Sequence, residues 1–211
     1  MPVNPESSVH EKFIFTAGSI HPARGLEDML IAFSSIHDQK PNVKLVIAGS
    51  TDSYMNSYKS KHNAMITKLG ITHGVEWAGT LPEREMSWCY RNCDAFVVTN
   101  RAEACPNVVL EAMVHGCICV STETPPMPEL FRDVAAYYPP KDERMLSKVI
   151  QKVLSWGKEK RYEMSEQAID RASQFSWDVC AEKTVAELKT TIENFTLRKR
   201  GKHTDAAMCR Y

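Results

Sequence analysis

Apolar and polar positions follow two alternating patterns along most of the chain. In the first pattern, short apolar runs end at glycine or at polar residues, which is typical of strands buried on both faces of a parallel sheet. These runs predict six strands, at residues 12–17, 43–48, 75–77, 95–99, 118–121 and 135–138.

In the second pattern, apolar residues between these runs recur every three or four positions, as on a helix with one buried face. Helices are expected over 26–36 and 108–115, with a more polar one over 54–69 and another that begins at Pro82. Strands that alternate with helices in this way predict an α/β fold, a doubly wound, Rossmann-like parallel sheet covered by helices on both faces.

The pattern changes after the sixth predicted strand, where only helices are expected. Two amphipathic stripes, over 146–154 and 181–195, predict extra C-terminal helices that pack back onto the sheet. The end of the chain is basic and loses the apolar period. We therefore divide the chain into a linker-like N-terminus over 1–11, one domain over 12–196 and a basic flexible tail over 197–211. The tail is expected to be solvated, with peripheral contact to an anionic membrane surface as the alternative.

Composition narrows the classes of function. The chain has 211 residues, of which 43% are hydrophobic, so it can bury a sizeable core and a disordered chain is excluded. Lys and Arg together number 26, as do Asp and Glu, so there is no long-range field to attract nucleic acid. No apolar run is long enough for a transmembrane segment, and the polar start does not resemble a secretion signal, so we expect a soluble, unprocessed chain.

The seven cysteines are an odd number spread over the whole chain, which favours a reducing, cytoplasmic location without disulfides. No Cys-x-x-Cys pair and no zinc-finger spacing occurs, so buried inert thiols are expected and a metal site is the lesser alternative.

The loop after the first predicted strand runs from Gly18 to Gly25 and contains Arg24. In open parallel sheets, ligands bind outside the carboxyl ends of the strands. Glycines permit close backbone approach, and a guanidinium offers planar donors to a phosphate. The glycines are too few for a dinucleotide or P-loop motif, and a surface arginine in a plain turn is the alternative.

The loop after the fourth predicted strand carries a stronger signal. Asn107 or Cys105 is expected to cap the next helix, with Pro106 at its start, so that free N–H groups form an anion site. Glu111 lies about 6 Å along the helix axis from its start, and Glu103 precedes the helix. A positive helix end between two carboxylates suits the diphosphate and hydroxyls of a nucleotide sugar. The helix dipole alone also favours a glutamate near a helix start.

Several segments together resemble a known family. They are 18–33, 43–49, 75–79, 103–116 and 121–129, and the most specific is 103–116, with two glutamates separated by seven residues. Over about 13–195 the chain resembles the carboxy-terminal, donor-binding domain of GT-B glycosyltransferases, specifically of retaining glycosyltransferase family 4, the glycosyl transferases group 1.

The resemblance implies roles for single residues. Glu111 would hold the ribose hydroxyls, and Glu103 would act at the donor sugar as a catalytic residue. Backbone N–H groups of Asn107 and Val108 would meet the diphosphate. Gly18 would let the diphosphate come close.

Two further sets of residues follow from the resemblance. Family members usually carry an arginine directly after the first glycine and a lysine before the next, where this chain has Ser19 and Arg24. Arg24 would therefore bind the diphosphate and assist catalysis, with Ser19 beside it. The nucleotide base would lie near Gly79, Thr80 and Leu81.

The expected function is the donor-binding part of a hexosyltransferase-like enzyme that moves a sugar from a nucleotide diphosphate to an acceptor hydroxyl with retention. The donor is a substrate, and neither a further cofactor nor a metal is expected. Family members also have an amino-terminal acceptor domain. The chain is therefore an excised piece, half of a split enzyme that needs a separate acceptor-binding chain, or a stand-alone binder. A non-catalytic nucleotide-binding or interaction module is the alternative from another class, and a nicotinamide dehydrogenase lacks its glycine motif here.

Overall fold

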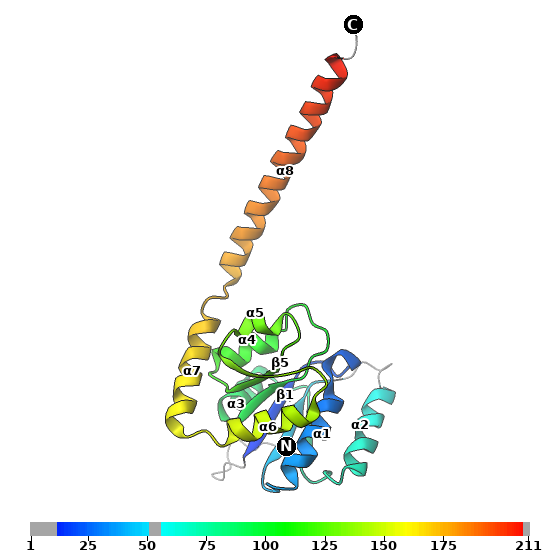
Figure 1. Ribbon diagram of the computed structural model, residues 1–211, viewed down its shortest axis with the longest axis vertical. Coiled ribbons are helices and arrows are strands. Elements are labelled where there is room, and N and C mark those ends of the chain that lie inside the picture. Colours follow the sequence, from blue (N-terminus) through cyan, green and yellow to red (C-terminus); the bar gives the residue numbers. More distant parts are fainter. Residues whose placement is uncertain (1–11, 51–55, 209–211) are drawn as a thin grey trace. The chain divides into compact units, whose positions relative to one another are not determined.

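The computed structural model describes residues 12–50 and 56–208 (Figure 1). The chain divides into two compact units, Met1–Ala172 and Ser173–Tyr211. The predicted linker over 1–11 lies outside the described residues.

A parallel sheet of six strands forms the centre of the first unit, in the order β3-β2-β1-β4-β5-β6. The strands are β1 Phe13–Ala17, β2 Lys44–Ala48, β3 Val75–Gly79, β4 Ala95–Val98, β5 Cys119–Thr122 and β6 Ala135–Tyr138. Each predicted strand is confirmed, with ends that differ by two residues or fewer. The strand order reverses between β1 and β4, which is where a ligand crevice is expected in such sheets.

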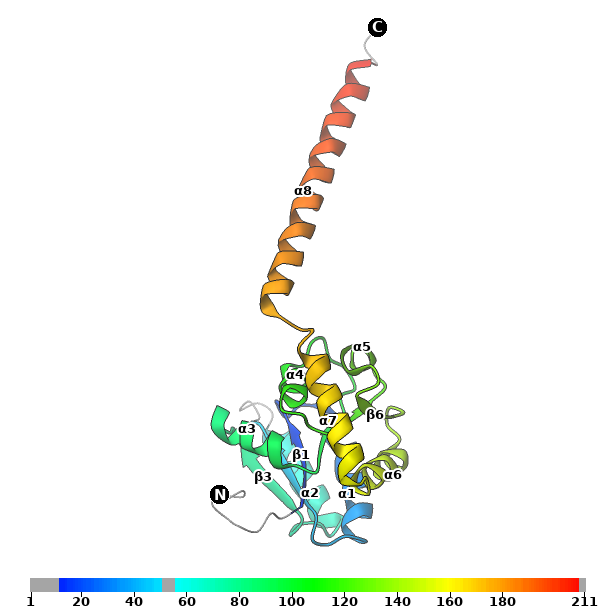
Figure 2. The ribbon, with the colours of Figure 1, turned by 90° about the vertical axis from the view of Figure 1, so that its left-hand side faces the viewer.

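Helices cover both faces of the sheet, as predicted for a doubly wound fold. In chain order they are the 3-10 helix η1 Pro22–Arg24, α1 Leu26–His37, α2 Asn56–Lys68, α3 Glu83–Asn92, α4 Asn107–Val114, α5 Met127–Phe131, α6 Glu143–Leu154 and α7 Lys158–Ala172. Figure 2 shows α3 on one side of β1 and α1 and α6 on the other. The same division separates the core into two clusters of buried side chains.

β1 shows why the strands are so apolar. Ile14 packs in the cluster with α1 and α6, whereas Phe13 and Phe15 pack in the cluster with α3 and α4. Successive side chains of a strand point to opposite faces, and here both faces are covered. A continuous apolar run is therefore required, which is the signal in the sequence.

The second unit contains α8, Trp177–Met208. The predicted return of two amphipathic helices onto the sheet is correct for α6, which packs against α1. The second stripe lies on α8 in the other unit, where Leu188, Ile192 and Phe195 are 58%, 64% and 59% exposed, and its return onto the sheet stays a prediction. The first compact unit ends at Ala172, whereas the predicted domain runs to residue 196.

Helix α8 also includes most of the predicted basic tail. Residues 197–208 continue α8, since lysine and arginine are good helix formers even where an apolar period is lacking. Residues 209–211 lie outside the described part. Within residues 12–50 and 56–208, every helix is too short or too polar to span a bilayer.

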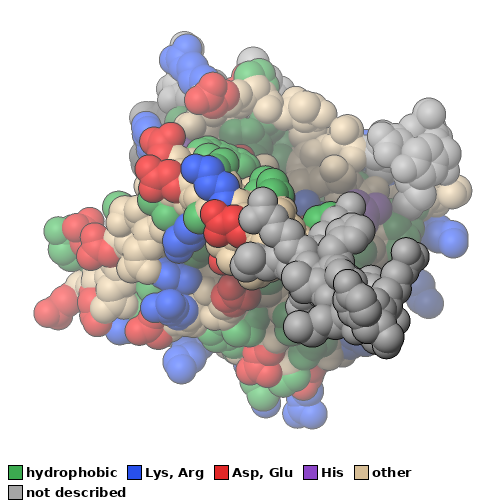
Figure 3. Space-filling model, turned by 90° about the horizontal axis from the view of Figure 1, so that it is seen from above, with side chains coloured by type: hydrophobic (Ala, Val, Ile, Leu, Met, Phe, Trp, Pro, Cys, Tyr) green, Lys and Arg blue, Asp and Glu red, His purple; other side chains and the backbone are tan. Residues whose placement is uncertain are grey.

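The chain has equal numbers of acidic and basic residues, and the two kinds of side chain lie close together on the surface that Figure 3 shows. Figure 3 shows acidic and basic side chains intermixed over one face of the molecule. Neither sign of charge therefore forms a broad patch on this face. On this face, a charge effect on a ligand must arise from particular residues in a site and not from a broad field.

Candidate functional site

A pocket lies at the carboxyl edge of the sheet, where β1 and β4 are neighbours. Residues from the loop after β1, among them Gly18, Ser19 and Arg24, line one side. Thr99 and Asn100, which directly follow β4, line the other side. The structure therefore brings the two predicted loops together at the reversal point of the sheet.

Gly18 leaves room for another group beside its backbone. In this structure the guanidinium of Arg24 is next to it. Gly18 has φ +128°, and a Cβ there would overlap the guanidinium of Arg24. Its N–H donates to Ala48 O at 3.0 Å, which holds the loop against the end of β2. The Arg24 side chain therefore lies over the position where the family resemblance places the diphosphate.

Arg24 and Glu103 meet through Asn100. Arg24 Nη1 donates to Asn100 Oδ1 at 3.3 Å, and Asn100 Nδ2 donates to Glu103 Oε2 at 3.1 Å. Arg24 Nη1 also lies 3.7 Å from Glu103 Oε2. The two predicted catalytic residues thus form one polar cluster, although Arg24 and Asn100 are 76 positions apart.

Asn100 is the one member of this cluster that was not predicted from the sequence. Its side chain is buried, at 2% exposure, between the two charged groups. The available signal was its place directly after the apolar run of β4, at the edge where ligands bind.

Burial changes the electrostatics of Arg24. It lowers the pKa of the guanidinium, and the nearby charge of Glu103 acts in the opposite direction. Arginine nevertheless stays protonated in proteins. The Arg24 Nε atom is buried without a hydrogen-bond partner, and the Glu103 contact is longer than a direct hydrogen bond. The arrangement therefore leaves a cation able to attract an anion in the pocket.

The helix start differs from the prediction. α4 begins at Asn107, its N-cap is Pro106, and no side chain caps it, so the predicted cap by Asn107 or Cys105 is wrong. Pro106 takes the extended cap conformation itself, which moves Asn107 into the first turn. The first N–H groups, at Asn107 and Val108, consequently lack a side-chain cap, which suits anion binding.

Glu111 lies farther along α4 and is held by a residue of α3. Tyr90 Oη donates to Glu111 Oε2 at 3.0 Å, and the Tyr90 ring stacks on His115 with centroids 5.3 Å apart. Burial and the Glu111 carboxylate raise the pKa of Tyr90, so it remains a donor. The exposed Glu111 side chain is thereby anchored. Tyr90 gave no sequence signal, because a buried tyrosine is also an ordinary core residue.

The predicted base site lies at the same edge of the sheet. Gly49 N donates to Gly79 O at 2.7 Å, which links the end of β3 to the end of β2. Leu81 packs against the α3 cluster, while Thr80 is exposed. These residues thus lie at the carboxyl edge of the sheet, with Leu81 contributing to the core, and their role at the base stays a prediction.

Possible metal ligands and the cysteine thiols are the remaining reactive side chains. Among the residues that the structure describes, no three His, Cys, Asp or Glu side chains form a group that could hold a metal ion. The six described cysteines are free. Cys89, Cys117 and Cys119 are buried as expected, and burial raises the pKa of Cys89 to about 12, whereas Cys105 and Cys180 are exposed.

Residues 3–171 match the family described as glycosyl transferases group 1. The chain belongs to this family. As a group 1 glycosyltransferase chain, it is 28% identical over 186 residues to an uncharacterized glycosyltransferase of Methanocaldococcus jannaschii, covering 87% of this chain and 46% of that relative. The chain spans about half the length of the curated relatives that it matches.

Solved structures show the same fold for this group 1 glycosyltransferase chain. The C-terminal domain of LpcC from Francisella tularensis, a glycosyl transferase group 1 family protein, has a TM-score of 0.69 at 19% identity, covering 77% of this chain and 85% of that one. Anabaena HepE in complex with UDP and glucose has a TM-score of 0.75 at 20% identity, covering 86% of this chain and 49% of that one. The predicted fold, a GT-B carboxy-terminal domain, is confirmed.

Proposed function

We propose that this chain is the donor-binding part of a retaining, hexosyltransferase-like enzyme that transfers a sugar from a nucleotide diphosphate to an acceptor hydroxyl. The observation that carries the proposal is the Arg24, Asn100 and Glu103 cluster beside the uncapped start of α4. A cation and free N–H groups suit a diphosphate, and a carboxylate suits sugar hydroxyls. The complex of Anabaena HepE with UDP and glucose supports a nucleotide-sugar donor.

Each site residue has a distinct part in this proposal. Arg24 and the N–H groups of Asn107 and Val108 bind the diphosphate and stabilise it as it leaves. Glu103 faces the donor sugar, and Glu111, anchored by Tyr90, accepts hydrogen bonds from the ribose.

The remaining contacts are with the ends of the donor. Gly18 and Ser19 border the diphosphate, and the backbone of Gly79, Thr80 and Leu81 borders the base. Positive charge comes from the protein itself, so we propose that neither a divalent metal nor a further cofactor is needed. The free cysteines support a cytoplasmic location.

Arg24→Ala should weaken binding of a nucleoside diphosphate by about tenfold and leave nucleoside binding nearly unchanged, because only the diphosphate carries the charge that Arg24 meets. Added salt should also weaken binding of the diphosphate by the wild-type chain, because it screens the charge of Arg24. Calorimetric titration with UDP, ADP and GDP and with their nucleosides measures both effects. Each titration is repeated with a chelator, which should change nothing if no divalent metal takes part.

Two further variants sharpen this test. Ser19→Arg restores the cation that relatives of this type usually carry and should tighten diphosphate binding. Arg91→Ala removes an exposed charge from the last turn of α3 and serves as the control, with wild-type binding expected. An equal loss of nucleoside and diphosphate affinity in Arg24→Ala would mean that Arg24 supports the fold instead.

A further inference from the structure

The loop after β4 is tied to the segment around η1 and α1 on both sides of Asn100. Before it, Thr99 Oγ1 donates to Arg24 O at 2.6 Å. After it, Arg101 N donates to Ala23 O at 2.7 Å. The backbone position of Asn100 therefore depends on its two neighbours, Thr99 and Arg101.

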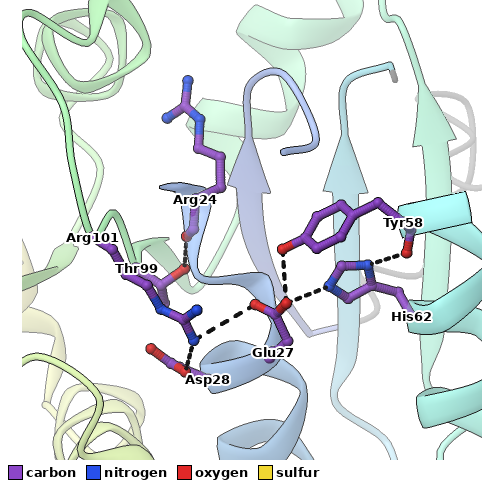
Figure 4. Close-up of polar contacts among 7 residues, drawn as sticks. All are labelled: Arg24, Glu27, Asp28, Tyr58, His62, Thr99 and Arg101. Carbon is purple, nitrogen blue, oxygen red and sulfur yellow. Dashed lines mark hydrogen bonds and ion pairs between the residues drawn. The ribbon is translucent and has the colours of Figure 1, made fainter. Parts of the chain in front are cut away.

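The Arg101 side chain adds a third tie, to α1. Its Nη2 donates to Asp28 Oδ1 at 2.6 Å and lies 3.6 Å from Glu27 Oε2 (Figure 4). The Asp28 side chain is only 3% exposed. A buried carboxylate needs a charged or hydrogen-bonding partner, and the Asp28 hydrogen bond in turn raises the pKa of Arg101. The pair is therefore a strong link between the loop and the helix.

Glu27 is itself held in place from α2. It accepts a hydrogen bond from Tyr58 Oη at 2.8 Å, and His62 Nε2 lies 3.7 Å from the same carboxylate oxygen (Figure 4). His62 is 1% exposed, and its Nδ1 donates to Tyr58 O at 2.8 Å. The Glu27 carboxylate that faces Arg101 is thus held from α2 by Tyr58 and does not simply follow the loop.

Gly25 makes this close packing feasible. It has φ +61°, and a Cβ there would overlap Thr99 O and lie 3.3 Å from Arg101 Cγ. The start of α1 and the end of β4 can therefore approach each other only because this position lacks a side chain.

We infer that Arg101 is a positioning residue: by binding Asp28 and Glu27 it holds the loop after β4 so that Asn100 sets Arg24 and Glu103 in their places. This inference rests on the proposed function, in which Arg24 meets the diphosphate of the donor. Arg101 acts through Asn100, which bonds to both charged residues. The hydrogen bonds of Thr99 and Arg101 hold the backbone on either side of Asn100. Loss of the Asp28 charge should therefore alter the position of Asn100 in the pocket.

Asp28→Asn separates positioning from direct charge attraction. The amide oxygen still accepts a hydrogen bond, but the buried negative charge facing Arg101 is gone. If Arg101 positions the loop, diphosphate affinity should fall by about tenfold, an ordinary size for coupling through neighbouring residues. If Arg101 simply attracted the diphosphate, removal of a negative charge beside it would leave the affinity unchanged or raise it. Asp38→Asn, an exposed position at the end of α1, gives the same change in net charge as the control.

A second measurement does not need a ligand. Amide hydrogen exchange over residues 99–104 should become about tenfold faster in Asp28→Asn, while β1 and the rest of β4 keep their protection. Arg101→Gln should show the same local change, with Arg91→Gln as its control, and Arg101→Lys should recover part of the protection. This second pair supplies the result if Asp28→Asn does not fold.

Wild-type exchange in folded Asp28→Asn and Arg101→Gln, or an unchanged or tighter diphosphate affinity in Asp28→Asn, would overturn the inference. Failure of the wild-type chain to bind any nucleoside diphosphate would instead refute the proposed function. The exchange comparison would still decide whether Arg101 holds the loop.

Discussion

Glu111→Ala is expected to weaken binding of a nucleoside diphosphate by roughly tenfold to a hundredfold. The proposed role of Glu111 is to accept hydrogen bonds from ribose hydroxyls, and loss of hydrogen bonds to a charged group typically costs roughly 1.5–3 kcal/mol. Tyr90 holds the Glu111 carboxylate from α3, so the acceptor is already oriented before the ligand arrives. Calorimetric titration of the wild-type chain and the variant with the same nucleotide panel measures the effect.

Comparison of pyrophosphate, nucleoside and nucleoside diphosphate shows which part of the ligand loses its contact in Glu111→Ala. Affinity for inorganic pyrophosphate should stay at the wild-type value in Glu111→Ala, because pyrophosphate has no ribose, whereas nucleoside affinity should fall with that of the diphosphate. Tyr90→Phe, which removes only the anchoring hydroxyl, should have a smaller effect. Glu159→Ala, at an exposed position in the first turn of α7, is the matched control and should bind normally. Wild-type nucleotide affinity in Glu111→Ala would contradict the assignment.

The sheet could be predicted because its strands are buried on both faces. Thr16 is the one polar position in the runs of β1 and β4, and a glycine or a polar residue marks the end of each run. The edge strand β3 is only partly buried, and its prediction was two residues too short. Burial on both faces therefore made the signal of the central strands, while the partly buried edge strand β6 was still predicted with its observed bounds.

The candidate site was predictable only in part, for a related reason. Arg24 and Glu103 are recognisable within their own loops, but their contact depends on β1 and β4 being neighbours. Asn100 and Arg101 act across that junction, so their place after β4 indicates the edge of the sheet but not the residues that they contact. The prediction of the helix cap was wrong because it rested on residue type alone. Asparagine is a common N-cap residue, but Pro106 has the extended backbone of the N-cap, so α4 begins at Asn107.

α8 shows the limit of amphipathic periodicity. The spacing of Val185, Leu188, Ile192 and Phe195 correctly predicts a helix with an apolar stripe. It does not state which surface covers that stripe, and in this structure these side chains are about half exposed or more. Periodicity reports which face of a helix is apolar, while the burial of that face depends on the rest of the fold.

The purified 211-residue chain is expected to bind its donor but not to transfer the sugar to a carbohydrate or lipid acceptor. The proposed residues bind the nucleotide, the diphosphate and one side of the sugar, and the chain spans about half the length of its curated relatives. We propose that the acceptor is held by a domain or chain outside these residues. Holding both reactants in one geometry accounts for about 7–11 kcal/mol of a typical two-substrate barrier. Without that contribution, radiolabelled sugar should not appear on an acceptor at an enzyme-like rate.

Slow hydrolysis of the donor is the residual activity to expect, because water needs no acceptor site. Glu103→Gln should reduce that hydrolysis while nucleoside diphosphate affinity stays near the wild-type value, since Glu103 faces the sugar in the proposed arrangement. Addition of an acceptor-binding partner should restore transfer if the two form one enzyme, and the anomeric configuration of the product, read by NMR, then tests retention. If the partner restores nothing although donor binding is intact, the alternative of a stand-alone binder is favoured. Rapid transfer by this chain as the only protein present would show that the acceptor site lies within it.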